Sequence, residues 1–314
     1  MQSKAKTIYL AQPRGFCAGV ERAILIVEEA LKKFGAPIYV RHEIIHNAYV
    51  VKELESRGVV FVDQLDQVPQ GSILIFSAHG VSKAVRLEAD TRQFQIFDAT
   101  CPLVAKVHAE VVSLKDRGYQ IIMIGHRGHP EVDGTMGQVQ SSIHLIESVA
   151  DVSQLEFPSD TLLAYVTQTT LSVDETKEIT AALMKKFPQI HAPKRQDICY
   201  ATQNRQDAVK AMIPKVDVII VVGSQNSSNS KRLQELALNM QVPAFLVDDP
   251  AQLKSEWFQL ANHIGVTAGA SAPETLTARM IEAIQAKFAA SVVPMPGIEE
   301  SVNFSLPKGL LEVA

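Results

Sequence analysis

Short apolar runs alternate with amphipathic helical patterns along this chain, and this alternation constrains its fold more than any other feature. The runs contain many β-branched residues and end at glycine or polar residues, which is typical of buried strands. Buried strands separated by helices favour parallel sheets covered by helices on both faces, so the sequence predicts an α/β fold. The segments that predict strands are 37–44, 71–80, 119–126, 162–168, 216–224 and 263–271.

Each of the three cysteines begins a helical pattern. The patterns are "CAGVERAILIV" from Cys17, "CPLVAKVHAEVV" from Cys101 and "CYATQNRQDAVKAM" from Cys199. Three similar segments predict three similar α/β domains around a shared centre. The expected division is an N-terminal strand (1–17) that packs with the third domain, domains at 18–101, 102–198 and 199–290, and a C-terminal tail (291–314).

Charge and hydropathy exclude two kinds of partner. The chain has 314 residues with 30 basic and 34 acidic side chains, a net charge of −4, and no basic cluster. We therefore expect no nucleic-acid surface. No apolar run approaches the roughly 20 residues that a membrane span requires, and the N-terminal segment lacks the apolar stretch of a signal peptide. We expect a cytoplasmic protein with no membrane contact, whose cysteines are thiols, thiolates or metal ligands.

The cysteine pattern allows several interpretations. A single cysteine is most often a small buried hydrophobe, and a nucleophilic cysteine needs only one such position beside a base. Structural zinc usually takes paired Cys-x2-Cys ligands, which this chain does not have. A thiol at a helix start lies at the positive end of the helix dipole, which favours the thiolate. Three separate thiolates fit a cuboidal iron–sulfur cluster with one iron that lacks a protein ligand.

Three histidines lie in loops that follow predicted strands, where open α/β sheets bind their ligands. They are His46, His79 and His129, and each loop is flanked by glycine or proline. Glu131 follows His129 in "HPE", which places an imidazole and a carboxyl on one stiff turn. This pair is suited to proton transfer.

Hydroxyl and amide side chains occupy the remaining loops after predicted strands. These are Thr169, Ser227, Ser228, Asn229 and Ser271. Helix capping is an alternative role, because Ser271 and Glu274 fit a capping box, and Asn229 or Ser230 fits the start of the next helix. Capping and anion binding use the same groups at a helix start, so "SSNS" also fits a phosphate site.

Eight motifs occur in one order along the chain. They are "PRGFCAGVERA", "IFSAHGVS", "FDATCPLV", "GHPEVDGTMGQ", "TQTTLSVD", "DICYATQNRQ", "GSQNSSNSKRL" and "TAGASAPE". Together they make the chain resemble the 4-hydroxy-3-methylbut-2-enyl diphosphate reductases, the last enzymes of the methylerythritol phosphate route to isoprenoids. The resemblance runs from about residue 8 to beyond residue 306.

The resemblance implies a [4Fe–4S] cluster held by Cys17, Cys101 and Cys199 at the centre of three α/β domains in a pseudo-threefold arrangement. It implies reduction of an allylic alcohol diphosphate by two electrons and two protons, with loss of water. The products would be isopentenyl and dimethylallyl diphosphate. An electron-donor protein of the flavodoxin or ferredoxin type would be the partner.

The resemblance also implies a role for each loop residue. Glu131, helped by Thr169 and with His129 nearby, would donate the proton that releases the substrate hydroxyl, and all three would meet that end of the substrate. The diphosphate would be held by His46, His79, Ser227, Ser228, Asn229 and Ser271.

Two other functions remain open at this point. An iron–sulfur hydro-lyase would also use three cysteines, but it needs neither a diphosphate site nor external electrons. A cluster-based redox sensor would have no use for the "HPE" and "SSN" loops.

Overall fold

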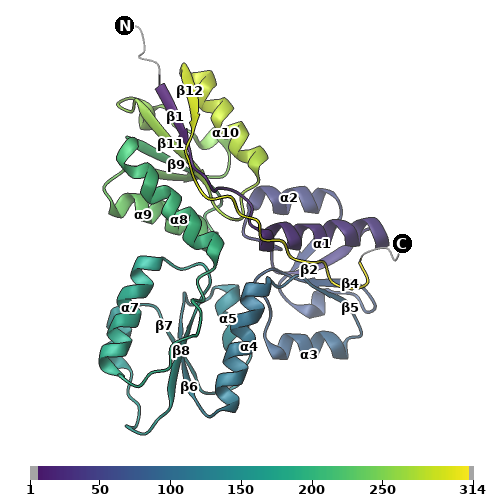
Figure 1. The fold of residues 1–314 in the computed structure, drawn as a ribbon. Coiled ribbons are helices and arrows are strands. Elements are labelled where there is room, and N and C mark those ends of the chain that lie inside the picture. The colour runs from purple at the N-terminus through teal and green to yellow at the C-terminus, as the bar shows by residue number, and fades with distance from the viewer. Residues whose placement is uncertain (1–5, 311–314) are drawn as a thin grey trace. The chain divides into compact units, whose positions relative to one another are not determined.

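The computed structural model describes residues 6–310, which form an α/β fold. Every strand pairing described in this range is parallel, as the buried apolar runs predict. Figure 1 shows the strands and the helices that pack against them. The predicted α/β class is confirmed.

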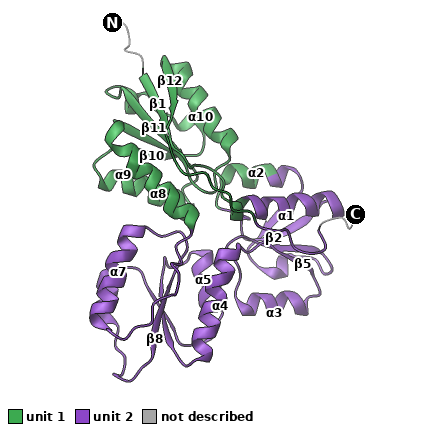
Figure 2. Ribbon diagram, viewed as in Figure 1, with its two compact units in different colours: residues 1–20, 46–53, 200–303 green, residues 21–45, 54–199, 304–314 purple. Residues whose placement is uncertain are grey.

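The chain divides into two compact units (Figure 2). Unit 1 contains residues 1–20, 46–53 and 200–303, and unit 2 contains residues 21–45, 54–199 and 304–314. Unit 1 has one five-stranded sheet, and unit 2 has one sheet of four strands and one of three. The predicted three-domain arrangement and its boundaries stay predictions.

The sheet of unit 1 has the strand order β10-β9-β11-β1-β12. Alternate residues of β9 face opposite sides: Ile220 packs towards helix α10, and Ile219 and Val221 pack towards α8 and α9. This double burial explains the continuous apolar run in the sequence. The strands are β1 (Lys6–Leu10), β9 (Val218–Val222), β10 (Ala244–Val247), β11 (His263–Ala268) and β12 (Ala290–Pro294).

The two sheets of unit 2 have the orders β3-β2-β4-β5 and β7-β6-β8. In β6, Met123 packs against helices α4 and α5, whereas Ile122 packs against α6 and α7. The strands are β2 (Ile38–Arg41), β3 (Val59–Val62), β4 (Ile73–Phe76), β5 (Gln95–Asp98), β6 (Gln120–Ile124), β7 (Ile143–Ile146) and β8 (Leu163–Thr167).

The helices begin at residues suited to helix starts. Pro102 occupies the first turn of α4, and Ser172 caps α7 by accepting a hydrogen bond from the Glu175 N–H. The α-helices are α1 (Ala18–Phe34), α2 (Ala48–Ser56), α3 (Lys83–Thr91), α4 (Pro102–Asp116), α5 (Pro130–Met136), α6 (Val149–Gln154), α7 (Val173–Lys186), α8 (Tyr200–Met212), α9 (Ser228–Asn239) and α10 (Glu274–Lys287). Short 3-10 turns lie at Leu65–Gln67, Ile213–Lys215, Pro250–Gln252 and Ser255–Phe258. No helix within residues 6–310 combines the length and apolar character that a membrane crossing requires.

All six predicted strands are present, as β2, β4, β6, β8, β9 and β11, and each of the three cysteines directly precedes a helix. Cys17 follows β1, Cys101 follows β5 and Cys199 follows α7. The other predicted site residues lie in the loops that follow the six predicted strands or in the first turn of the next helix. This is the position at which parallel α/β sheets bind their ligands.

Candidate active site

A buried carboxyl group lies in unit 2 where α5 begins beside the end of β8. Glu131 is only 3% exposed and sits in the first turn of α5. Its two carboxyl oxygens accept hydrogen bonds from the backbone N–H (2.6 Å) and the hydroxyl (3.0 Å) of Thr169. Two of the three residues that the resemblance assigns to the hydroxyl end of the substrate are therefore in direct contact.

Burial raises the pKa of Glu131 to about 7. The two hydrogen bonds from Thr169 act in the opposite direction, and the nearby Asp197 carboxyl raises the pKa further. About half of the Glu131 side chains therefore carry a proton at neutral pH, as a general acid requires.

His129 is the N-cap residue of α5, and its Nδ1 accepts a hydrogen bond from the Glu131 N–H (3.1 Å). Because Nδ1 is the acceptor, the neutral ring carries its proton on Nε2. The ring of His79 lies edge-on to His129 with 5.9 Å between centroids. The Nδ1 of His79 is 3.2 Å from the Ser77 hydroxyl. Unit 2 thus brings two imidazoles, a carboxyl and a hydroxyl close together.

The backbone of each cysteine is tied to a loop that follows a strand. Each cysteine N–H donates to a carbonyl oxygen in such a loop: Cys17 to Ala270 (3.2 Å), Cys101 to Ala78 (3.0 Å) and Cys199 to Thr169 (3.0 Å). In each case the acceptor is a predicted site residue or the residue directly before one. The three cysteines therefore share one local geometry.

The three cysteines are half-buried and are not cross-linked as disulfides. Burial raises the pKa of the Cys17 thiol, while the N–H groups of Val20 and Gly19 and the charge of Arg205 lower it. The helix start alone was expected to favour the thiolate, but desolvation is the larger effect at Cys17.

No three His, Cys, Asp or Glu side chains in residues 6–310 gather as ligands of one metal ion. An iron–sulfur cubane does not require three ligands on one metal ion, because each thiolate binds a separate iron. Three thiols, each half-buried at the start of a helix, match the donor chemistry of such a cluster.

Unit 1 contains five of the six predicted diphosphate residues, and the sixth, His79, lies in unit 2. Ser227 is the N-cap of α9, and its hydroxyl lies 3.2 Å from the Ser271 hydroxyl. The Ser271 hydroxyl donates to the backbone oxygen of His46 (3.0 Å). The Asn229 side-chain oxygen accepts a hydrogen bond from the Ala270 N–H (2.8 Å). Ser228, the first residue of α9, is half-buried.

The backbone is crowded around these hydroxyls. A Cβ atom at Gly269 would lie 2.0 Å from the Ser230 hydroxyl oxygen. Only glycine allows the end of β11 to approach α9 this closely. The cluster of hydroxyl and N–H donors at the start of α9 has the chemistry of an anion site.

Two capping predictions are wrong. The residue before α10 is Pro273, which makes no side-chain cap, so Ser271 and Glu274 do not form a capping box. The Ser271 hydroxyl instead bonds to His46. Ser227 caps α9 by accepting from the Ser230 N–H, and neither Asn229 nor Ser230 holds that position.

Two buried charged residues were missed by the sequence analysis. Asp197 accepts a hydrogen bond from the Thr167 N–H (3.1 Å) and pairs with Lys106 (3.2 Å). Arg205 is fully buried in α8. Both lie within or beside the "DICYATQNRQ" motif, which was the available signal, although their partners are far away in sequence.

The loops of these parallel sheets carry a buried carboxyl that can be protonated, imidazoles and clustered hydroxyls, and three thiols lie at helix starts. These features define an α/β enzyme. The chain belongs to the LytB protein family, whose model matches residues 8–285. It is 61% identical over 303 residues to a 4-hydroxy-3-methylbut-2-enyl diphosphate reductase of Ralstonia nicotianae, covering 96% of this chain and 94% of the relative. A protein of the same name from Azoarcus is 60% identical and covers 97% of this chain and 98% of the relative.

Two solved structures are similar to this chain. One is described as the E-1-hydroxy-2-methyl-but-2-enyl-4-diphosphate reductase of Plasmodium falciparum. It has a TM-score of 0.94 and 42% sequence identity, with 98% of this chain and 97% of that chain covered. The other is described as (E)-4-hydroxy-3-methyl-but-2-enyl diphosphate reductase, the terminal enzyme of the non-mevalonate pathway. It has a TM-score of 0.64 and 30% identity, with 90% and 99% covered.

Proposed function

We propose that this chain catalyses the reductive dehydroxylation of 4-hydroxy-3-methylbut-2-enyl diphosphate to isopentenyl diphosphate and dimethylallyl diphosphate. The chain is an oxidoreductase of the LytB family, and relatives at about 60% identity carry the name of this reductase. The observation that most directly supports this chemistry is the buried Glu131 carboxyl, held by Thr169, with its pKa raised to about 7.

Cys17, Cys101 and Cys199 would hold a [4Fe–4S] cluster, within a pseudo-threefold arrangement of three α/β domains. When bound, this cluster supplies electrons one at a time and a Lewis-acidic iron. The common N–H to loop-carbonyl bond of the three cysteines supports their common role. The electrons would come from a flavodoxin- or ferredoxin-type protein.

The residues of unit 2 would act at the hydroxyl end of the substrate. Glu131 would donate its proton to the departing hydroxyl, which leaves as water. Thr169 keeps the carboxyl in one orientation through two hydrogen bonds. His129 accepts from the Glu131 N–H at Nδ1 and therefore presents a donor at Nε2.

The hydroxyl and amide groups of unit 1 would bind the diphosphate, together with two imidazoles. The residues assigned to this role are His46, His79, Ser227, Ser228, Asn229 and Ser271. Hydroxyls and backbone N–H groups at the start of α9 would donate hydrogen bonds to the diphosphate, and the imidazoles of His46 and His79 would add further donors. We propose that the reaction takes place in the cytoplasm.

An anaerobic assay tests this proposal against its two alternatives. The reconstituted protein is mixed with substrate in the presence and absence of reduced methyl viologen, and both products are quantified. A reductase forms product only with the reductant. Turnover without reductant would favour a hydro-lyase, and no turnover in either condition would favour a redox sensor.

A further inference from the structure

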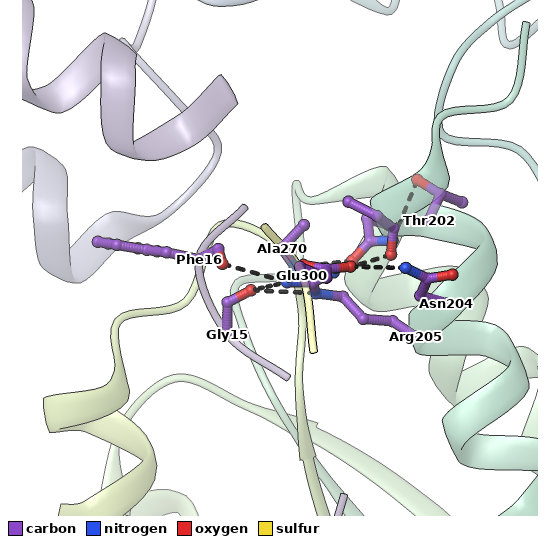
Figure 3. A network of polar contacts seen from close by, with 9 residues as sticks. Gly15, Phe16, Thr202, Asn204, Arg205, Ala270 and Glu300 are labelled. Atoms are coloured by element: carbon purple, nitrogen blue, oxygen red, sulfur yellow. Dashed lines mark hydrogen bonds and ion pairs between the residues drawn. The ribbon is translucent and has the colours of Figure 1, made fainter. Parts of the chain in front are cut away.

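A fully buried arginine lies next to the loop that carries Cys17. Arg205 belongs to α8 in unit 1 and is 0% exposed. An unpaired charge at such a position would be very costly, so its contacts indicate what the residue does. Figure 3 shows that its guanidinium group is directed at residues 15 and 16 and at the carboxyl of Glu300.

The guanidinium group holds the backbone that leads into Cys17. Nε and Nη2 donate to the carbonyl of Gly15 at 3.0 and 2.6 Å, and Nη2 also donates to the carbonyl of Phe16 at 3.1 Å. Gly15 has a φ of +70°, so the chain turns sharply just before the cysteine. Nη1 donates to the Ala201 carbonyl (3.0 Å), which joins this turn to the first residues of α8.

The counter-charge comes from the C-terminal segment. Glu300 accepts from Arg205 Nη1 (3.0 Å) and from the side chain of Asn204 (2.9 Å). This segment runs beside the residues that follow β1, because β12 pairs with β1 in parallel and the Met295 N–H donates to the Leu10 carbonyl. A Cβ atom at Gly297 would lie 1.9 Å from the Gln12 oxygen, so the two backbones are in direct contact.

The opposite side of the Cys17 loop is fixed by the loop after β11. Gly15 N–H donates to the Ala268 carbonyl and Cys17 N–H to the Ala270 carbonyl, both at 3.2 Å. Ala270 N–H in turn donates to the Asn229 side chain. The backbone of residues 15–17 is therefore held on one side by a charged side chain and on the other by two main-chain hydrogen bonds.

We propose that Arg205, neutralised by Glu300, is a positioning residue that fixes the direction in which the Cys17 thiol points. The inference rests on the proposed function, because the positioning by Arg205 would serve to present Cys17 as a cluster ligand. Three charge-assisted bonds to two successive carbonyls require the forked geometry of arginine, which lysine cannot reproduce.

The test is the reactivity of Cys17 in the full-length, cluster-free protein. Iodoacetamide labelling is followed with time, and each cysteine peptide is quantified by mass spectrometry. The variants are Arg205→Lys, Arg205→Gln, and the double variant Arg205→Met with Glu300→Gln, which leaves no unpaired buried charge and is chosen to keep the fold. The matched control is Arg232→Gln, since Arg232 is a half-buried arginine of the same unit that pairs with Glu235.

The loss of charge-assisted bonds to the loop should raise the labelling rate of Cys17 at least about tenfold in the double variant, which removes the opposite effects of the Arg205 and Glu300 charges on the Cys17 pKa together. The Gln variant loses only the Arg205 charge, which lowers that pKa, so its labelling rate should rise less. Arg205→Lys should give a smaller rise. Cys101 and Cys199 should stay within about twofold of the wild type, as should all three cysteines in Arg232→Gln. An unchanged Cys17 rate, or an equal rise at all three cysteines, would overturn the proposal. If neither the Gln nor the double variant folds, Arg205 is a folding element and the proposal is also overturned.

Reconstitution of the iron–sulfur cluster distinguishes failure of this proposal from failure of the proposed function. If the wild type takes up no cluster, the proposed function fails while the labelling result still decides the role of Arg205. If the wild type is loaded, a folded Arg205→Lys should lose iron to a chelator faster than Arg232→Gln. Equal rates of iron loss would contradict the positioning role.

Discussion

At the scale of single residues, the environment of Glu131 determines the chemistry that this chain can perform. Its carboxyl is buried and accepts hydrogen bonds from two neutral donors of Thr169. Desolvation therefore exceeds hydrogen bonding in its effect on the pKa. The next carboxyl along the helix, Asp133, is exposed. Glu131 and Asp133 thus differ in burial although both lie in the first residues of α5.

Replacement of Glu131 by Gln should remove the proton donor and keep the shape. We expect the rate of single-turnover reduction to fall by about 10²–10⁴-fold, with substrate affinity and iron content retained. Rapid-quench measurement under anaerobic conditions gives the rate. Asp133→Asn is the matched control and should stay near wild type. A fast Gln variant, or a dead Asn variant, would mean that the acid is another residue.

The pH dependence of the reaction should report the same group. Glu131 is the active acid only when protonated, and its pKa is raised to about 7. The single-turnover rate should therefore be constant at low pH and fall about tenfold per pH unit above neutrality. The measurement is the rate profile from about pH 6 to about pH 9. A rate that rises across this range would contradict an acid role.

Stability should also depend on this proton. Between the ordinary value of 4.5 and about 7, folded Glu131 keeps a proton that the unfolded chain releases. The free energy of unfolding should therefore decrease as pH rises through this window, by about 3 kcal/mol in total. Urea unfolding of cluster-free wild type and Glu131→Gln at both ends of the window tests this. If the difference between the two proteins does not change with pH, Glu131 is ionised in the folded state.

At the scale of elements, the apolar pattern predicted one edge strand, β8, and missed the other edge strands of the described sheets. All five residues of β8 are buried, and an isolated bridge joins Ala164 to His191 beside it. Strands β3, β5, β7, β10 and β12 were not predicted, and each lies at the edge of its sheet. An edge strand buries fewer side chains, so it lacks the continuous apolar run that identifies a strand covered on both sides. The burial of β12 illustrates this, since none of its residues is fully buried.

One buried carboxylate connects three elements of unit 2. Asp197, in the segment before α8, accepts from the Thr167 N–H at the end of β8 and pairs with Lys106 of α4. Asp197→Ala would leave a buried N–H without its acceptor and should lower the free energy of unfolding by about 1–3 kcal/mol. Urea denaturation measures the loss. Asp160→Ala, at an exposed position, is the control and should change stability by less than about 0.5 kcal/mol. If Asp197→Ala and Asp160→Ala lower the free energy of unfolding equally, the contacts of Asp197 do not stabilise unit 2.

At the scale of the whole molecule, the sequence motifs indicated the candidate site residues but not the residues that keep their loops in position. The thiols, imidazoles and hydroxyls were recognisable because their types and spacing carry chemical meaning. Asp197 and Arg205 were not recognised, since the partners of Arg205, such as Gly15 and Glu300, are distant in sequence. A single sequence gives no signal for such a pairing, and the three-dimensional contacts were required to find it.

The central claim is that three cysteines from separate parts of the chain hold one redox cluster. The most direct test is the iron and sulfide content of protein purified without oxygen, for wild type and for Cys17→Ala, Cys101→Ala and Cys199→Ala. We predict about four irons and four sulfides per wild-type chain and loss of the intact cluster and of reductive turnover in each variant. Full iron content and activity in any one of the three variants, or bound zinc without sulfide in the wild type, would contradict the account.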